Sequence, residues 1–113
     1  MPESFDRAVL DRLREALGDD TGVFAARLIE TFLRQGGELV LQLEQAARGD
    51  DVPVVSALAH KLKGSSGSVG GDRLVLLCDE LEHWEGNGTS LGAKVASVRE
   101  AVRQLSLELA SYS

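Results

Sequence analysis

The sequence has few of the residues that build disulfide frameworks, loops or membrane spans. It contains one cysteine, Cys78, and two prolines among 113 residues. A single cysteine excludes an internal disulfide and fits a reducing compartment, so we expect a cytoplasmic protein. No apolar run approaches the ~20 residues that are needed to cross a bilayer. The N-terminal segment has neither the basic region nor the apolar region of a secretory signal.

The sequence also lacks an excess of positive charge and lacks the patterning of strands. The net charge is −6, which argues against binding to nucleic acid or to an anionic membrane. No segment alternates apolar and polar residues between turns, as a half-buried strand would. Leucine and alanine dominate the apolar residues, which favours helices. The length suits a single domain over residues 1–113, since no repeat or linker divides the chain.

Glycine and aspartate divide the chain into five amphipathic helical segments. The expected helices cover about residues 5–17, 21–48, 50–69, 72–85 and 90–109. Ser4 is expected to cap the first helix and Gly18 to stop it, and Thr89 or Ser90 is the expected N-cap of the last. Gly36-Gly37 interrupts the second segment, which we interpret as one long helix with a weak point, although two helices remain an alternative. These segments predict an all-α fold, an antiparallel up-down four-helix bundle with an additional short N-terminal helix.

The third segment carries the residues with a chemical role. On a helical wheel at about 100° per residue, the arc that faces the core consists of Val55, Leu58, Leu62 and Val69. His60 points directly away from that arc. Its neighbours on the surface are small residues and one lysine, namely Ser56, Ala57, Lys63, Gly64 and Gly67. Glycine inside a helix costs ~1 kcal/mol relative to alanine, so the two exposed glycines indicate that another protein approaches the ring.

This pattern suggests that His60 is a nucleophile. A neutral imidazole has a free lone pair and can attack an electrophile. Lys63, one turn along the helix, can attract a phosphoryl group carried by the ring. Spacing alone leaves another interpretation open, in which His60 is an ordinary surface histidine on a glycine-rich helix.

The surrounding sequence resembles a known family signature. Its parts are Ala59-His60-Lys61-Leu62-Lys63-Gly64-Ser65-Ser66, then Val69-Gly70, then Leu74, Cys78, Leu81 and Glu82. Together they resemble the motif of histidine-containing phosphotransfer (Hpt) domains. The resemblance implies a four-helix bundle in which His60 is phosphorylated, Lys63 supplies electrostatic attraction for the phosphoryl group and Gly64 gives steric access. Where the family commonly has a small polar residue, this chain has Lys61, which we expect to tune partner choice.

The resemblance also implies a role and partners. The chain would be a phosphoryl carrier in a multistep two-component phosphorelay, accepting the group from a receiver-domain phospho-aspartate and passing it to another receiver aspartate. The implied partners are response-regulator receiver domains and a sensor histidine kinase, which can be a hybrid kinase. We expect Ser56, Ala57, Lys61 and Gly67 to contact the partner. We expect no metal site and no bound cofactor, with Mg²⁺ coming from the receiver domain, and we expect a monomer that is not itself an enzyme.

Two alternatives stay open. The first is a non-catalytic helical docking module that binds a signalling partner through the glycine-rich face. The second is a module of a larger kinase, against which the position of Met1 just before a capped helix argues weakly. The remaining polar residues are interpreted structurally. We expect a core thiol at Cys78, edge-of-core packing at Trp84, and solvated surface at His83 and at the acidic cluster of Asp79, Glu80, Glu82 and Glu85.

Overall fold

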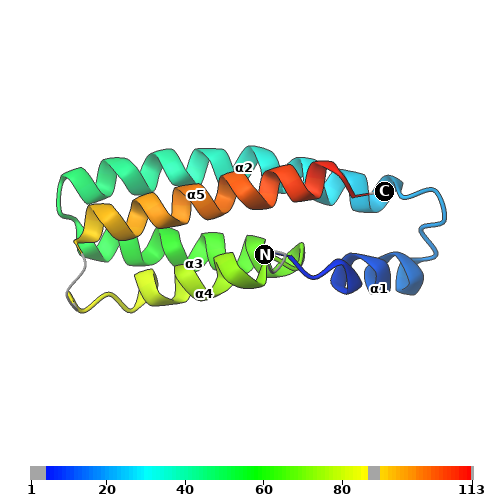
Figure 1. Cartoon of the computed structure of the whole chain (residues 1–113), viewed down its shortest axis with the longest axis horizontal. Helices are drawn as coiled ribbons and strands as arrows, with labels where there is room; N and C mark the ends of the chain where they lie inside the picture. The colour runs from blue at the N-terminus through cyan, green and yellow to red at the C-terminus, as the bar shows by residue number, and fades with distance from the viewer. Residues whose placement is uncertain (1–4, 87–89, 113) are drawn as a thin grey trace.

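The computed structural model describes residues 5–86 and 90–112. It contains the helices α1 (Arg7–Leu17), α2 (Val23–Arg48), α3 (Val52–Ser68), α4 (Asp72–Glu82) and α5 (Leu91–Ala110). Helices α2 to α5 run up and down in turn, and each packs on two others, so that α3 and α5 both contact α2 and α4 (Figure 1). No strand occurs in the described residues, which confirms the all-α prediction. None of these helices combines the length and the apolar character that a membrane span requires.

The short helix α1 lies beyond the ends of α3 and α4, beside the N-terminal part of α2 (Figure 1). Phe5 and Leu10 are buried and attach it to the core. Its N-cap is Asp6, whose carboxylate accepts from the Ala8 N–H at 3.0 Å, so the helix begins two residues later than predicted. The predicted cap, Ser4, lies outside the described residues. Gly18 ends the helix with φ 64°, as predicted.

The segment before α1 is anchored to the turn between α3 and α4. The Asp6 N–H donates to the Gly70 carbonyl at 2.7 Å. Gly70 has φ +78°, and a Cβ there would lie 2.5 Å from the Asp6 carbonyl oxygen. Both the backbone conformation and the close approach therefore require glycine at this position.

Helix α2 is one continuous helix of 26 residues through Gly36-Gly37. This confirms the interpretation as a single helix and removes the alternative of two. Gly36 is buried, and a Cβ there would lie 3.5 Å from Val102 Cγ1 on α5. That distance is ordinary van der Waals contact, so packing of α2 against α5, and not a need for glycine, keeps the helix continuous here despite the low helix propensity of two glycines.

The N-termini of α3 and α5 follow local capping rules, whereas the C-terminal end of α4 departs from the prediction. Asp51 caps α3 by accepting from the Val54 N–H, and Ser90 caps α5 by accepting from the Ala93 N–H. Thr89, the other predicted cap, lies outside the described residues. Helix α4 ends at Glu82 and not near residue 85. Trp84, two residues beyond that end, is half-buried and packs against the core.

The buried face of α3 is wider than the predicted arc. Val55, Leu62 and Val69 are fully buried, as expected. Leu58 also faces the core, as expected, but it is half-buried and packs at the edge of the buried cluster. Ala59 and Ser66 are fully buried as well. This helix packs between two neighbours, α2 and α4, and the small side chains allow that close packing. The Ser66 hydroxyl is satisfied by donating to the Leu62 carbonyl at 2.7 Å.

Candidate functional site

His60 stands on the outer face of α3, with 69% of its side chain exposed. Its Nδ1 atom lies 3.0 Å from Oε2 of Glu82, on the last turn of α4. A carboxylate oxygen can only accept a hydrogen bond, so Nδ1 carries the proton in this contact. In the neutral ring Nε2 then keeps its lone pair and is the nucleophilic atom. The orientation predicted from the helical wheel is confirmed, and Glu82 defines the tautomer.

Glu82 is itself held by Lys63. Its Oε1 atom has no contact with solvent and lies 2.7 Å from the Lys63 ammonium. The contact with the Lys63 ammonium, assisted by the hydrogen bond from His60 and opposed by desolvation, holds the pKa of Glu82 below its usual value. The same contact, together with the hydrogen bond that Lys63 donates to Asp79 at 3.1 Å, raises the pKa of Lys63. Glu82 therefore stays a carboxylate and Lys63 an ammonium around neutral pH.

The predicted solvated acidic face was wrong for Glu82, which is half-buried, whereas Asp79, Glu80 and Glu85 are exposed. Glu82 and Asp79 face α3 and pair with Lys63, whereas Glu80 pairs with Lys94 on α5. The sequence offered one signal that Glu82 belongs to the site, since Glu82 falls within the motif that resembles the Hpt signature. Helical periodicity could not predict the contact between Glu82 and Lys63, because that contact depends on how α3 and α4 pack.

Potential metal ligands also gather beside His60. Asp79, Glu82 and His83 bring ligand atoms within 4.8 Å of one another. The Lys63 ammonium already contacts both carboxylates, and His83 Nδ1 lies 2.9 Å from the Asp79 carbonyl oxygen. The cation that balances these carboxylates is therefore a side chain of the protein itself. His83 is exposed, as predicted.

The small residues expected around His60 divide into two groups. Ala57, Gly64 and Gly67 are exposed, and a Cβ at Gly64 would meet no atom within 4 Å. Ser56 is half-buried, and its hydroxyl donates to the Glu82 carbonyl at 2.7 Å. This bond satisfies a carbonyl at the C-terminus of α4. The Ser56 hydroxyl thus ties α3 to α4, whereas the other three leave the surface near the ring open.

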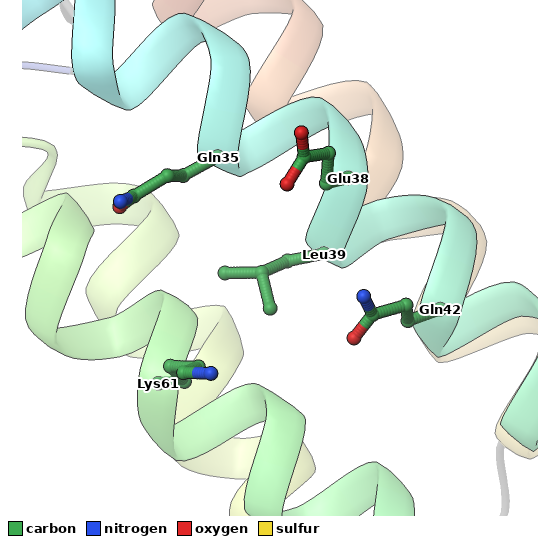
Figure 2. A pocket seen from close by; sticks show the side chains of 5 residues that line it. All are labelled: Gln35, Glu38, Leu39, Gln42 and Lys61. Atoms are coloured by element: carbon green, nitrogen blue, oxygen red, sulfur yellow. The ribbon is translucent and has the colours of Figure 1, made fainter.

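The two lysines next to His60 lie on opposite sides of it. Lys63 turns toward α4, where both of its partners lie. Lys61 turns toward α2 and lines a surface cleft there (Figure 2).

The remaining predictions nearby concern the core. Cys78 is buried, which raises the pKa of its thiol to about 12, and Trp84 packs half-buried against the core.

Comparison with known proteins gives the family. Residues 27–110 match the family model described as the Hpt domain. The chain belongs to the Hpt domain family. Over 108 residues it is 26% identical to Multistep phosphorelay regulator 1 of Schizosaccharomyces pombe. The aligned segment covers 96% of this chain but only 35% of the length of that protein.

Two solved structures share the fold of this chain. The crystal structure of histidine-containing phosphotransfer protein B (HptB) from Pseudomonas aeruginosa PAO1 superposes with a TM-score of 0.81 at 24% identity, covering 97% of this chain and 94% of that one. The crystal structure of Ypd1p gives a TM-score of 0.82 at 18% identity, with 97% and 93% coverage. The helical bundle of this Hpt domain is therefore shared with proteins whose sequences differ widely from it.

Proposed function

We propose that this Hpt domain is a phosphoryl carrier of a multistep phosphorelay and that His60 is its acceptor. The observation that carries the proposal is the state of the His60 ring. Its Nδ1–H is fixed by Glu82, and the ring is exposed on a face where Gly64 leaves the space open. Membership of the Hpt family and the likeness to a phosphorelay regulator support the same role.

The chemistry follows from the geometry. Nε2 of His60 attacks the phosphorus of an aspartyl phosphate in line with the leaving oxygen. The N–P bond forms, the P–O bond breaks, and the partner aspartate leaves as a carboxylate. The Nδ1 proton stays in its bond to Glu82, whose negative charge opposes the positive charge that the ring gains. Transfer to a second aspartate is the same reaction in reverse.

The other components come from the partner. Receiver domains of response regulators and of a sensor kinase would dock over α3, and Mg²⁺ held by the receiver would neutralise charge on the phosphoryl oxygens. In this scheme Lys63, Ser56 and Glu82 shape the acceptor, and the chain carries the group without catalysing its own phosphorylation. The site would work in the cytoplasm, where we also expect the chain to be a monomer.

A direct test is to incubate the protein with a phosphorylated receiver domain and to measure acid-labile label on the chain. We expect His60→Gln to abolish labelling, since Nε2 is the only acceptor in the scheme. Because the residue is exposed, we expect stability to change by no more than about 0.5 kcal/mol. Circular dichroism melting checks the fold of the same preparation.

The experiment also separates the carrier from a docking module. A docking module would bind the receiver domain, for example in a titration followed by fluorescence, and would take up no label. Retained label in His60→Gln would instead place the acceptor elsewhere. A large loss of thermal stability in that variant would give His60 a structural role.

A further inference from the structure

A cleft of about 190 Å³ lies between α2 and α3, where it is lined on α3 by Lys61, the residue that follows His60 in the chain (Figure 2). Leu39, only 6% exposed, points into it from α2 and forms an apolar floor. We call this the α2–α3 cleft. Its exposed polar walls are made by Gln35, Glu38 and Gln42 of α2 and by Lys61 of α3.

The polar side chains that wall the α2–α3 cleft make no hydrogen bond or ion pair with any other described residue. Glu38 and Lys61 have opposite charges and line the same cleft, yet they form no ion pair with each other. Other charged groups nearby are paired, as Lys63 is with Glu82 and Asp79. The cleft therefore presents one cation, one anion and two amides whose hydrogen-bonding capacity is available to another molecule.

Docking over His60 has to cover this cleft. In-line transfer needs the reacting atoms within about 3–3.5 Å, and a stable protein interface buries roughly 800 Å² per partner. Lys61 follows His60 in the chain and lines the cleft, so a partner that reaches Nε2 also covers Lys61 and its neighbours. A charge that loses its water without gaining a partner weakens binding strongly. A productive partner must therefore complement both charges.

Building on the proposed function, we infer that the α2–α3 cleft selects among receiver domains. The selected receiver places a carboxylate against Lys61 and a basic side chain against Glu38, with apolar atoms over Leu39. The amides of Gln35 and Gln42 adapt to either a donor or an acceptor. Receivers with the opposite arrangement of charges are rejected by like-charge contacts.

Three variants test this inference: Lys61→Glu, Glu38→Lys and the double variant with both changes. The probe is the phosphorylated receiver domain, from a panel, that transfers fastest to the unmodified chain. We expect each single variant to lower kcat/KM for transfer about tenfold, because a like-charge contact replaces an attractive one. We expect the double variant to be the slowest, since both contacts to the receiver are then repulsive.

The double variant distinguishes contacts with the receiver from a contact between Lys61 and Glu38 themselves. If Lys61 and Glu38 acted only on each other, reversing both would preserve their attraction and restore the rate, which would overturn the inference. Arg73→Glu is the matched control for Lys61→Glu, because it makes the same change in net charge at an exposed position of α4 outside the cleft. Equal slowing in this control would show a general charge effect and would also overturn the inference.

A small phosphodonor separates this inference from the proposed function. Phosphoramidate is too small to contact the cleft while it reacts with His60. We therefore expect it to label His60 at the same rate in the unmodified chain and in all the cleft variants. Labelling of His60→Gln by phosphoramidate would refute the acceptor assignment. Normal labelling combined with unchanged receiver transfer in all three cleft variants would refute the role of the cleft alone.

Discussion

The two flanks of His60 differ in how their charged groups are satisfied. On the α4 flank, Lys63 contacts Glu82 and Asp79, and Glu82 binds the imidazole. On the α2 flank, Lys61 and Glu38 line an open cleft without intramolecular partners among the described residues. A closed network fixes the geometry of a nucleophile, whereas free charges suit contact with a second protein. Helix α3 thus lies between the α4 flank, whose residues orient His60, and the α2 flank, whose charges are available to a partner.

The largest effect short of removing His60 is expected from opening the α4 flank. Glu82→Ala removes the acceptor for Nδ1–H, so the ring can rotate and exchange tautomers. We expect transfer to slow roughly 10–100-fold, as for other residues that orient a functional histidine. Nitrogen chemical shifts of the ring should show a mixture of tautomers in the variant. Glu85→Ala, at an exposed position just beyond α4, is the control and should leave rate and tautomer unchanged.

Gly64 tests whether the surface between the flanks must stay open. Space around its missing Cβ is empty, so Gly64→Ala should stabilise the fold by up to ~1 kcal/mol through helix propensity and reduced unfolded-state entropy. Gly64→Gln should fold but obstruct the approach of the partner to Nε2. Melting curves and transfer time courses measure the two effects separately.

The contrast variant for this experiment is Gly70→Ala. Its Cβ would lie 2.5 Å from a backbone oxygen at positive φ, so its melting temperature should fall sharply. Full transfer by Gly64→Gln would contradict the access role of Gly64. A fall in the melting temperature of Gly64→Ala would contradict the empty space seen around that residue.

Removing Lys63 should weaken the α4 flank only in part. In Lys63→Ala, Glu82 loses its ammonium partner but keeps the bond to His60, so we expect transfer to slow several-fold and the effect to shrink at high salt. Lys94→Ala is the control, because Lys94 pairs with Glu80 away from the ring. An unchanged rate at low salt would show that neither the phosphoryl group nor Glu82 depends on Lys63.

The smallest expected effect is the pH dependence of stability. The pKa of Glu82 is lowered in the fold, chiefly by the contact with the Lys63 ammonium. Its contribution is therefore present above the usual glutamate pKa and is lost as pH falls through the lowered value. We expect Glu82→Gln to melt below the unmodified chain at neutral pH and the difference to shrink in strong acid. A difference that persists unchanged in acid would assign the effect to packing.

Most of the fold could be predicted from local patterns. Asp51, Ser90 and Gly18 act at the helix ends where capping rules place them, because these interactions lie within one turn of sequence. The errors arose where packing decides. Ala59 and Ser66 are buried beside the predicted arc because α3 packs between two helices, and α4 ends at Glu82, earlier than predicted.

The sequence by itself determined that His60 faces outward on a surface of small residues, since that depends only on the period of a helix. It could not determine that Glu82, 22 residues away, binds Nδ1, nor that Lys61 and Lys63 serve opposite flanks. Both depend on which helices lie beside α3. Hydrogen bonds and ion pairs act over a few ångströms, so only the packed bundle decides which carboxylate meets the ring and which charges remain available to a partner.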